Sequence, residues 1–528
     1  MNPGGSGVSP TNDGVAPGLP GAATVFSRDD IGGNTTLECD VVIVGSGAGG
    51  ATCAAELAEH GVDVIVVEEG RHLGTETFTP EATRMIRAMY RDGGATVALG
   101  SPPILYQEGS VVGGSTVING GMSWRTPERI LSRWQIEDGL DRISAADMEI
   151  YFERVERRIH VAPQDTESIG VDNALLKKGA DALGWKTFGN LRNQVHCPGS
   201  NNCAFGCPTG AKQSALVSYV PRALHFGARI YSDIRVTEVL RRGKRAIGVL
   251  GHVVTEDKKR GAAVTVRARL VISACGAIHT PALLWRSGYR SPSGLLGHRM
   301  SMHPNVKVVA LFDEPVRGWE GVHQAYQVRE FQDEGLVFAA VNVPPSVLAM
   351  SFPAYGAALG DLMAKYDRML VAGMLCEDTA TGRLKRMPGG RPQAFYQMND
   401  FDADKLKRGT ALLCELLFEA GAKTIMLPFG GVADLTSPDQ VRRLMSDRVP
   451  KERMEVLTVH MMGTARMGAD RAGAVTDHYG FLYDADRMMV CDASLFPSPI
   501  GVNPMETIQA LATRNMHHLL SNRARYLT

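Results

Sequence analysis

The chain has no surplus of either charge. Lys and Arg together number 56, and so do Asp and Glu, so the formal net charge of the 528 residues is zero. Nucleic-acid binding rests on a cationic surplus, and we therefore expect no nucleic-acid partner. The first residues, Met1 to Val25, contain no Lys or Arg and are rich in Gly, Pro, Ser and Asn. A secretory signal peptide begins with basic residues and continues with an apolar stretch, so we expect a disordered tail over residues 1–36 and a cytoplasmic or partner-dependent location.

An unbroken apolar helix of membrane-spanning length is also missing. The longest run without Asp, Glu, Lys or Arg covers the 26 residues 335–360. It is long enough for a bilayer, but Asn342, Pro344, Pro345 and Pro353 would break a helix and leave backbone groups unpaired in lipid. We expect no transmembrane segment. The run is interpreted as a core strand and loop of a substrate domain, or alternatively as a loop that packs over an active site or touches a membrane surface.

Paired cysteines are not expected, because the cysteines number nine in a chain without a signal sequence. Six of them stand singly in apolar surroundings and should act as small core residues. The other three, Cys197, Cys203 and Cys207, share a loop of Gly, Asn and Pro at residues 196–212. Thiolates this close can ligate zinc or an iron–sulfur cluster, but no fourth ligand is evident beyond the adjacent His196. Free thiols that stiffen or line the loop are the favoured alternative.

The chain is longer than one hydrophobic core normally serves, so two domains are expected. Near the start, Asp40–Val44 is a short apolar run typical of a buried parallel strand. A helix is expected over Ala51–His60, ended by Gly61, and a second strand over Val64–Val67. This order is a βαβ unit, the minimal half of a dinucleotide site.

Three glycines join the first strand to the helix. Gly45, Gly47 and Gly50 form a GxGxxG set, in which the first permits a tight turn, the second lets a pyrophosphate approach, and the third lets helix pack on strand. The helix N-terminus then offers N–H groups and partial positive charge to phosphates. Glu68 ends the second strand, where an acid accepts hydrogen bonds from a ribose. The unit predicts a dinucleotide-binding site but does not distinguish FAD from NAD.

The rest of the chain contains further expected strands, and its C-terminal part returns to this first domain. Strands are expected over Arg229–Val239 and Ala246–Val254, and the region from roughly 300 to 450 shows no repeat. Near the C-terminus, a strand over Met488–Cys491 and a helix over Met505–Leu520 should rejoin the first sheet. The expected architecture is a discontinuous nucleotide domain with a second domain inserted into it.

Several strings resemble the signatures of the glucose–methanol–choline (GMC) family of flavin alcohol oxidoreductases. They follow the family's order and bracket about residues 40 to 520. The nearest members are long-chain alcohol oxidase-like and pyranose-type. The strings are Gly109–Gly120 (GSVVGGSTVING), Gly276–Gly288 (GAIHTPALLWRSG), His460–Gly468 (HMMGTARMG), and Val490–Ser494 (VCDAS) followed by Asn503-Pro504-Met505.

The resemblance implies bound FAD. Gly113, Gly114 and Asn119 would line the flavin, and Asp492 would contact its pyrophosphate–ribityl portion. Some members attach the flavin through a His beside the asparagine of the first signature. Ile118 stands at that place here, so we expect non-covalent FAD.

By the same matching of positions, His460 and Asn503 are the catalytic pair. An alcohol does not lose its hydroxyl proton unaided, and an imidazole with a pKa near 6.5 is a suitable general base. A second polar group should hold the oxygen as negative charge develops. The resemblance makes His460 the base and Asn503 the second group. His279 and His303 are minor candidates for the site and are interpreted as structural.

The expected fold is therefore α/β: a Rossmann-like FAD-binding domain in two parts, residues 37–300 and 451–528, with an inserted α+β substrate domain at residues 301–450. The expected reaction is oxidation of an alcohol to an aldehyde or ketone by hydride transfer to flavin N5. A hydrophobic alcohol (long-chain, sterol or terpenoid) is the favoured substrate, and oxygen, a quinone or a redox protein the acceptor. The alternative is a sugar dehydrogenase subunit that relays electrons through an iron–sulfur cluster to a cytochrome.

Overall fold

The structure of the protein is a computed structural model that describes residues 24–528, so most of the predicted tail lies outside it. Residues 24–36 depart from the prediction of disorder. Ser27 caps the short helix η1 (Arg28–Asp30), and the ring of Phe26 stacks on that of Tyr231 at 4.8 Å. The first strand then begins at Thr35, five residues earlier than the apolar pattern alone indicated.

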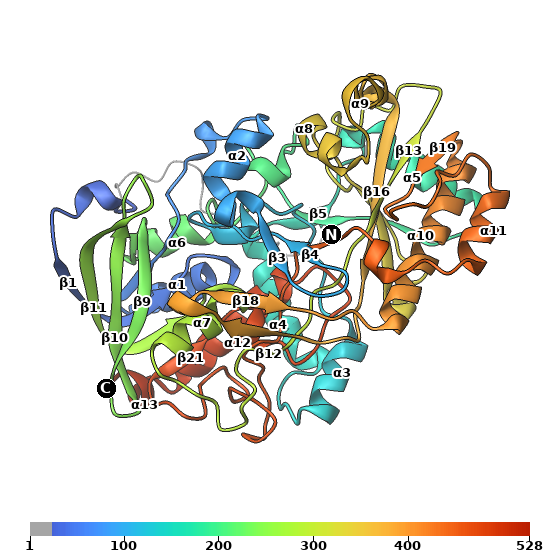
Figure 1. Ribbon diagram of the computed structural model, residues 1–528. Helices are drawn as coiled ribbons and strands as arrows, with labels where there is room; N and C mark the ends of the chain where they lie inside the picture. Colours follow the sequence, from blue (N-terminus) through green and yellow to red (C-terminus); the bar gives the residue numbers. More distant parts are fainter. Residues whose placement is uncertain (1–23) are drawn as a thin grey trace, which may run out of the picture.

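A seven-stranded sheet forms the first layer and lies at one end of the molecule in Figure 1. Five of its strands run parallel, and two add an antiparallel edge. Its longest strand is shared: the first half pairs with the antiparallel edge and the second half with the last strand of the chain. The order is β8 (Arg229–Tyr231), β2 (Val64–Val67), β1 (Thr35–Val44), β11 (Arg260–Ser273), β10 (Arg245–Val254) and β9 (Ile234–Arg242), with β21 (Met488–Val490) beside β11.

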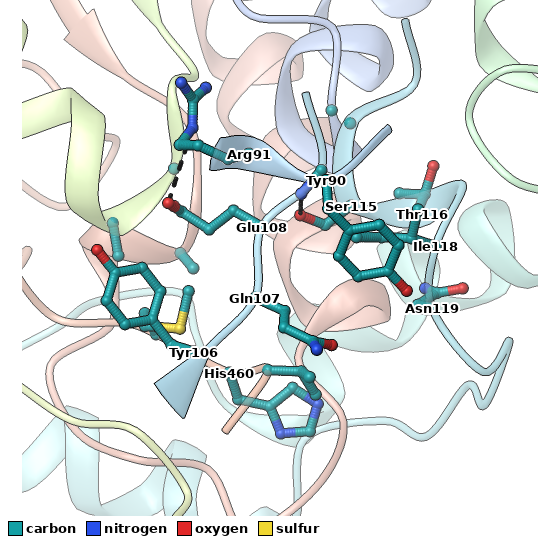
Figure 2. A pocket seen from close by; sticks show the side chains of 18 of the residues that line it. Tyr90, Arg91, Tyr106, Gln107, Glu108, Ser115, Thr116, Ile118, Asn119 and His460 are labelled. Atoms are coloured by element: carbon teal, nitrogen blue, oxygen red, sulfur yellow. Dashed lines mark hydrogen bonds and ion pairs between the residues drawn. The ribbon is translucent and has the colours of Figure 1, made fainter. Parts of the chain in front are cut away.

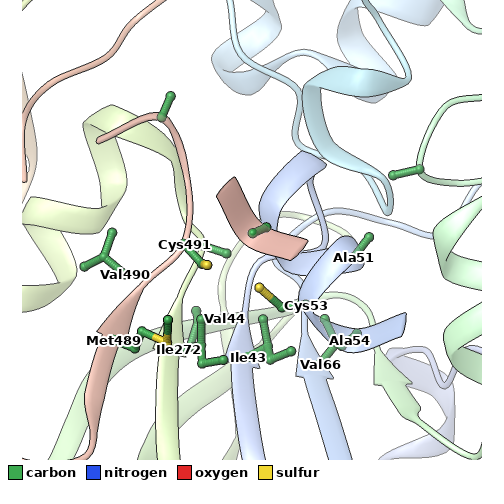
Figure 3. Packing of buried hydrophobic residues seen from close by; sticks show 14 of the residues in the cluster. Ile43, Val44, Ala51, Cys53, Ala54, Val66, Ile272, Met489, Val490 and Cys491 are labelled. Carbon is green, nitrogen blue, oxygen red and sulfur yellow. The ribbon is translucent and has the colours of Figure 1, made fainter. Parts of the chain in front are cut away.

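Small residues let α1 (Ala48–Glu59) lie close to this sheet. A Cβ at Gly50 would fall 1.9 Å from the carbonyl oxygen of Gly45, and one at Gly49 would fall 1.8 Å from that of Cys491. α1 packs on α12 (Met505–Ser521), and Figure 3 shows Cys53 and Cys491 side by side in the core between them and the strands. The third glycine of the GxGxxG set thus serves packing, as predicted. Of the six single cysteines, four are buried, namely Cys53, Cys376, Cys414 and Cys491, and Cys39 and Cys275 are half-buried.

A second, antiparallel sheet builds the other end of the molecule (Figure 1). One face packs on α5 (Val171–Ala182) and α10 (Asp400–Ala420) and forms a separate apolar core. Both α5 and the edge strand β6 lie before residue 300, so this layer extends beyond the predicted 301–450 segment. The order is β19 (Thr424–Met426), β13 (Lys307–Leu311), β16 (Met369–Cys376), β15 (Leu336–Ala340), β14 (Tyr326–Val328) and β6 (Thr187–Gly189).

The uncharged run at residues 335–360 forms β15, then a loop, and then the short helices α8 (Pro345–Leu348) and α9 (Gly356–Met363). Among the helices of residues 24–528, none combines the length and apolarity needed to cross a membrane. The predicted α/β architecture with a Rossmann-like domain is confirmed. The remaining elements are α2 (Ala82–Met89), β3 (Thr96–Ala98), β4 (Ile104–Tyr106), α3 (Glu128–Glu137), α4 (Ala145–Arg158), β5 (Val161–Pro163), β7 (Leu191–Asn193), α6 (Tyr219–His225), α7 (Gly276–Arg286), β12 (His298–Met300), β17 (Gly382–Arg386), β18 (Pro392–Phe395), α11 (Asp439–Ser446), β20 (Val456–Thr458) and α13 (Arg523–Leu527).

Candidate active site

A cavity of about 790 Å³ is lined by residues of both sheets. Most residues predicted from the sequence to form the site line this one cavity, although they come from opposite ends of the chain. Gly50 and Gly113 do not line it. Those that do are Gly45, Gly47, Glu68, Gly114, Asn119, His460, Asp492 and Asn503.

Three helices begin at the cavity without a side-chain cap. Their first residues, including Ala48 of α1, Gly276 of α7 and Met505 of α12, all line it. An uncapped helix start leaves N–H groups unpaired and carries partial positive charge. The first turns of α1 and α7 also contain no acidic residue. The start of α1 in particular fits an anionic group such as a pyrophosphate.

Two glycine loops meet beside α1. The N–H of Gly113, a residue with φ of 94°, donates to Oγ of Ser46 at 3.0 Å. A Cβ at Gly114 would lie 2.7 Å from Cα of Gly47. The absence of side chains here leaves a cradle that a Cβ would fill. Gly113 therefore positions the loop, whereas Gly47 and Gly114 line the cavity.

Glu68 holds the turn between β1 and α1. One carboxylate oxygen accepts from N–H and Oγ–H of Ser46, both at 2.8 Å, and the other accepts from N–H of Gly70 at 2.8 Å. Burial raises the pKa of Glu68, although these hydrogen bonds oppose the effect. A carboxylate oxygen has further acceptor capacity, so a ribose hydroxyl fits at the same group. The predicted position of Glu68 at the cavity is observed, and its ribose contact stays a prediction.

A charged network that the sequence reading missed lies next to Glu68. Burial disfavours ionisation of Glu69, but Arg91 and Arg235 outweigh it and lower the pKa of Glu69 to about 2. Figure 2 shows Arg91 reaching the carboxylate of Glu108, a pair separated by 3.8 Å. In the same view His460 lies at the opposite end, beside Gln107. The cavity is therefore strongly charged at its nucleotide end.

Asp492 joins the C-terminal strand to α7. Its carboxylate accepts from N–H of Gly276 at 3.0 Å, from N–H of Ser494 at 2.8 Å, and from the hydroxyl of Thr280. Burial raises its pKa. A buried carboxylate with this many donors fixes the start of α7 and accepts from the first N–H of that helix.

The two predicted catalytic residues belong to different loops of the cavity. His460 follows β20, and its backbone N–H donates to Oγ1 of Thr458 at 3.1 Å. Asn503 precedes α12, and its Oδ1 is buried without a hydrogen-bond partner among the described residues. Burial, together with the neighbouring His303, lowers the pKa of His460 well below 6.5. His460 is therefore a neutral imidazole at physiological pH.

His303, interpreted as structural from the sequence, contacts His460 directly: the two Nδ1 atoms lie 3.2 Å apart. Nε2 of His303 accepts from the backbone N–H groups of Ile500 and Gly501 at 3.2 and 3.1 Å. Its ring proton must therefore sit on Nδ1 and point at Nδ1 of His460. In that pairing the neutral ring of His460 carries its own proton on Nε2.

A buried carboxyl group fixes the segment that carries His303. Asp378 accepts from the backbone N–H groups of Met302 and His303 at 3.0 and 3.2 Å, and from the hydroxyl of Tyr396 at 2.9 Å. Burial raises the pKa of Asp378 to about 7. The string Met302-His303-Pro304 was visible in the sequence, but nothing in it indicates the contact with His460, which lies 157 positions away.

The three-cysteine loop supports the predicted flavin-facing segment. Nζ of Lys212 donates to the carbonyl oxygens of Val117, Asn119 and Cys203 at 2.8, 2.8 and 2.6 Å. Arg192 donates to Sγ of Cys203 at 3.4 Å. The loop therefore holds the backbone around Asn119 in place.

The metal prediction for Cys197, Cys203 and Cys207 is not supported. Within residues 24–528, no group of three or more His, Cys, Asp or Glu side chains is placed to hold a metal ion. Sγ of Cys207 instead accepts from N–H of Lys212 at 3.4 Å and contacts Oγ1 of Thr209 at the same distance. The close spacing in sequence thus reflects a tight loop around Lys212.

Comparison with known proteins decides the family. Two models described as GMC oxidoreductase match residues 86–305 and 380–512, and a model of an NAD(P)-binding Rossmann-like domain matches residues 43–104. The chain is a GMC oxidoreductase. A GMC-type oxidoreductase of Sinorhizobium fredii is 33% identical over 93% of this chain and 96% of that protein.

More distant relatives agree with this assignment. A long-chain-alcohol oxidase of Arabidopsis thaliana is 26% identical over 92% of this chain and 68% of that protein. A formate oxidase variant of Aspergillus oryzae has the same fold, with a TM-score of 0.72 at 15% identity, over 93% of this chain and 99% of that one. Family membership makes this GMC oxidoreductase an FAD-dependent enzyme acting on CH–OH groups.

Proposed function

We propose that this GMC oxidoreductase oxidises an alcohol to an aldehyde or ketone, with His460 as the general base and Asn503 holding the alcohol oxygen. The observation that carries the proposal is the presence of His460 and Asn503 in one cavity with the glycine loops and uncapped helices that fit FAD. Bound FAD supplies the hydride acceptor at N5. Ile118 lines the cavity and offers no atom for a covalent bond to the flavin, so the cofactor is proposed to be non-covalent.

His303 determines how His460 meets the alcohol. In the resting tautomer, Nε2–H of His460 can donate to the alcohol oxygen, while Nδ1 accepts from His303. To take the hydroxyl proton on Nε2, His460 must first hold its own proton on Nδ1, which breaks the contact with Nδ1–H of His303. The base role therefore carries a cost of about 1 kcal/mol or more, the net value of a typical hydrogen bond. Asn503 supplies a polar group that cannot titrate.

The wall formed by the second sheet is mostly apolar, which supports a hydrophobic alcohol as the substrate. Val337, Ala339 and Val341 of β15 and its following loop line the cavity, together with Leu375 of β16. The long-chain-alcohol oxidase among the relatives agrees with this class. The alternative of an electron-relaying sugar dehydrogenase subunit loses its main support, because no metal group forms at the cysteine loop within residues 24–528. Oxygen, a quinone or a redox protein is proposed as acceptor.

The test is anaerobic flavin reduction by candidate alcohols in FAD-loaded protein. His460→Ala should slow reduction by about 10²-fold or more, the usual scale of general-base catalysis. His460→Gln is the matched variant, because a glutamine still donates a hydrogen bond but cannot take a proton. An equal loss in both variants supports the base role. Retention of near-native rates by His460→Gln would show that His460 only holds the oxygen.

A further inference from the structure

The second sheet presents two chemically different faces. Along β13, Val308 and Ala310 point into the apolar core beneath α5 and α10. Lys307 lies on the opposite face and lines the cavity. Because successive strand residues alternate between faces, Lys307 stands on the same wall as the apolar Val337, Ala339 and Leu375. The substrate chamber thus has an apolar wall that contains one cation.

Among the described residues, the ammonium group of Lys307 has no counter-ion, because it makes no ion pair and no side-chain hydrogen bond. The side chain is half-buried in the wall of the cavity. Burial alone lowers the pKa of Lys307, to about 8, and no neighbouring carboxylate raises it again. A charge that is partly withdrawn from solvent and has no partner is available to bind an anion that enters the cavity. At pH 7 the group is still mostly protonated.

The fold makes room for this lysine. Lys307 pairs with Gly373 of the neighbouring strand β16. A Cβ at Gly373 would lie 3.1 Å from Cγ of Lys307 and 3.3 Å from Oδ1 of Asn305. The glycine therefore leaves space for both side chains on the cavity side. Any larger residue at position 373 would crowd the lysine.

Neighbouring side chains add further unpaired polar groups. Nδ1 of His323 accepts from N–H of Asn342 at 3.3 Å, so its neutral ring carries a proton on Nε2. Burial lowers the pKa of His323 to about 3, and the charges of Arg192 and, to a smaller extent, Lys307 add to the effect. Oδ1 of Asn305 is buried without a hydrogen-bond partner among the described residues. His323 and Asn305 both line the cavity beside Lys307.

We propose that Lys307 binds a carboxylate on the alcohol substrate, with His323 as a second donor. The substrate class would then be hydroxy acids whose hydroxyl and carboxylate groups are separated by an apolar portion. The apolar wall would contact that portion, while His460 and Asn503 meet the hydroxyl group. This inference rests on the proposed alcohol oxidation and narrows its substrate from a hydrophobic alcohol to one that also carries an anion. A substrate bearing ammonium groups would be repelled.

The first test measures binding without catalysis. FAD-loaded protein is titrated with decanoate, which has the carboxylate but no hydroxyl group, and the flavin difference spectrum gives the dissociation constant. Lys307→Met should weaken decanoate binding by about 10²-fold, the loss expected when one partner of a buried charge pair is removed. Lys186→Met, an exposed lysine outside the cavity, is the matched control and should bind decanoate as the wild type does. Removal of an unpaired, half-buried charge should not impair folding of the Lys307 variant.

The second test measures anaerobic flavin reduction with ω-hydroxy acids and α,ω-diols of matched chain length. The wild type should bind the hydroxy acid more tightly, and Lys307→Met should abolish that preference. Equal affinity of wild type and Lys307→Met for decanoate would overturn the proposal. So would a Lys307→Met variant whose only defect is a changed flavin spectrum or reduction potential, because the lysine would then serve the cofactor. If neither alcohol reduces the flavin while decanoate binding still depends on Lys307, the carboxylate site stands and the proposed oxidation fails.

Discussion

Replacement of His303 should slow flavin reduction. From the sequence alone, this residue was interpreted as structural. In His303→Ala, the buried N–H groups of Ile500 and Gly501 lose the ring nitrogen that accepts them at 3.2 and 3.1 Å. Each buried donor left unpaired costs about 1–3 kcal/mol. The same loop continues to Asn503, so a shift of the loop that gives these donors new partners would also move that residue.

The size of the effect follows from the displacement of Asn503. If the transition state loses about 3 kcal/mol because one positioned polar group is displaced, the rate falls by roughly 10²-fold. His460 also loses the Nδ1–H of His303, which donates to its Nδ1 and holds its ring. We expect His303→Ala to retain FAD, because the hydrogen bonds of His303 do not involve Glu68 or the glycine loops beside α1.

The assay is the limiting rate constant of anaerobic flavin reduction at saturating alcohol, normalised to bound flavin. His303→Gln is the conservative variant: its carbonyl oxygen can accept from the backbone N–H groups and its amide can donate to His460, so it should keep most of the rate. His298→Ala, an exposed histidine on β12, is the surface control. A flavin-loaded His303→Ala protein that reduces at the wild-type rate would refute the reasoning.

Three further outcomes are expected. Acid precipitation should release the yellow colour into the supernatant, since Ile118 stands where a tethering histidine is expected; colour in the pellet would contradict non-covalent binding. With a neutral alcohol, flavin reduction should be independent of pH from about 6.5 upward, because burial lowers the pKa of His460 and the ring loses its neutral form only at lower pH. With a hydroxy acid, binding should be strong below about pH 8 and weaken above it as Lys307 loses its proton. Burial also lowers the pKa of Lys212 to about 8. The assignment to Lys307 therefore requires that Lys307→Met remove this pH dependence.

Local patterns were sufficient to predict the nucleotide half of the molecule. The run Val64–Val67 is β2 itself, and the C-terminal strand and helix begin at the predicted Met488 and Met505. Gly50 could be assigned correctly because the spacing of glycines in a βαβ unit follows from close contact of strand and helix. Periodicity and turn residues determine structure between residues that are close in sequence, so they can be recognised without knowledge of the fold.

The substrate half could not be predicted in the same way, because its features depend on pairing between distant segments. Nothing near Lys307 reveals that Gly373 lies opposite it, or that no carboxylate approaches it. β6 is only three residues long, so the sequence does not reveal that it pairs with β14 at the edge of the second sheet. The spacing of the cysteines was misleading for a related reason: short loops place thiols near one another in sequence, but the buried Lys212 occupies the centre of this one.

The sharing of β11 between two partners has a consequence for how the protein is made. β1 pairs with β11 over most of its length, but the second half of β11, Val271–Ser273, stays an open edge until Met488–Val490 adds to it. On a ribosome, which adds about 5–20 residues per second, β21 is among the last strands to emerge. During that interval the growing polypeptide exposes an apolar strand edge that favours aggregation. The cradle for the nucleotide also lacks Asp492 until then, so FAD can enter only after synthesis is nearly complete. We therefore expect the nascent enzyme to need chaperone protection, and truncation before β21 to yield insoluble, colourless protein.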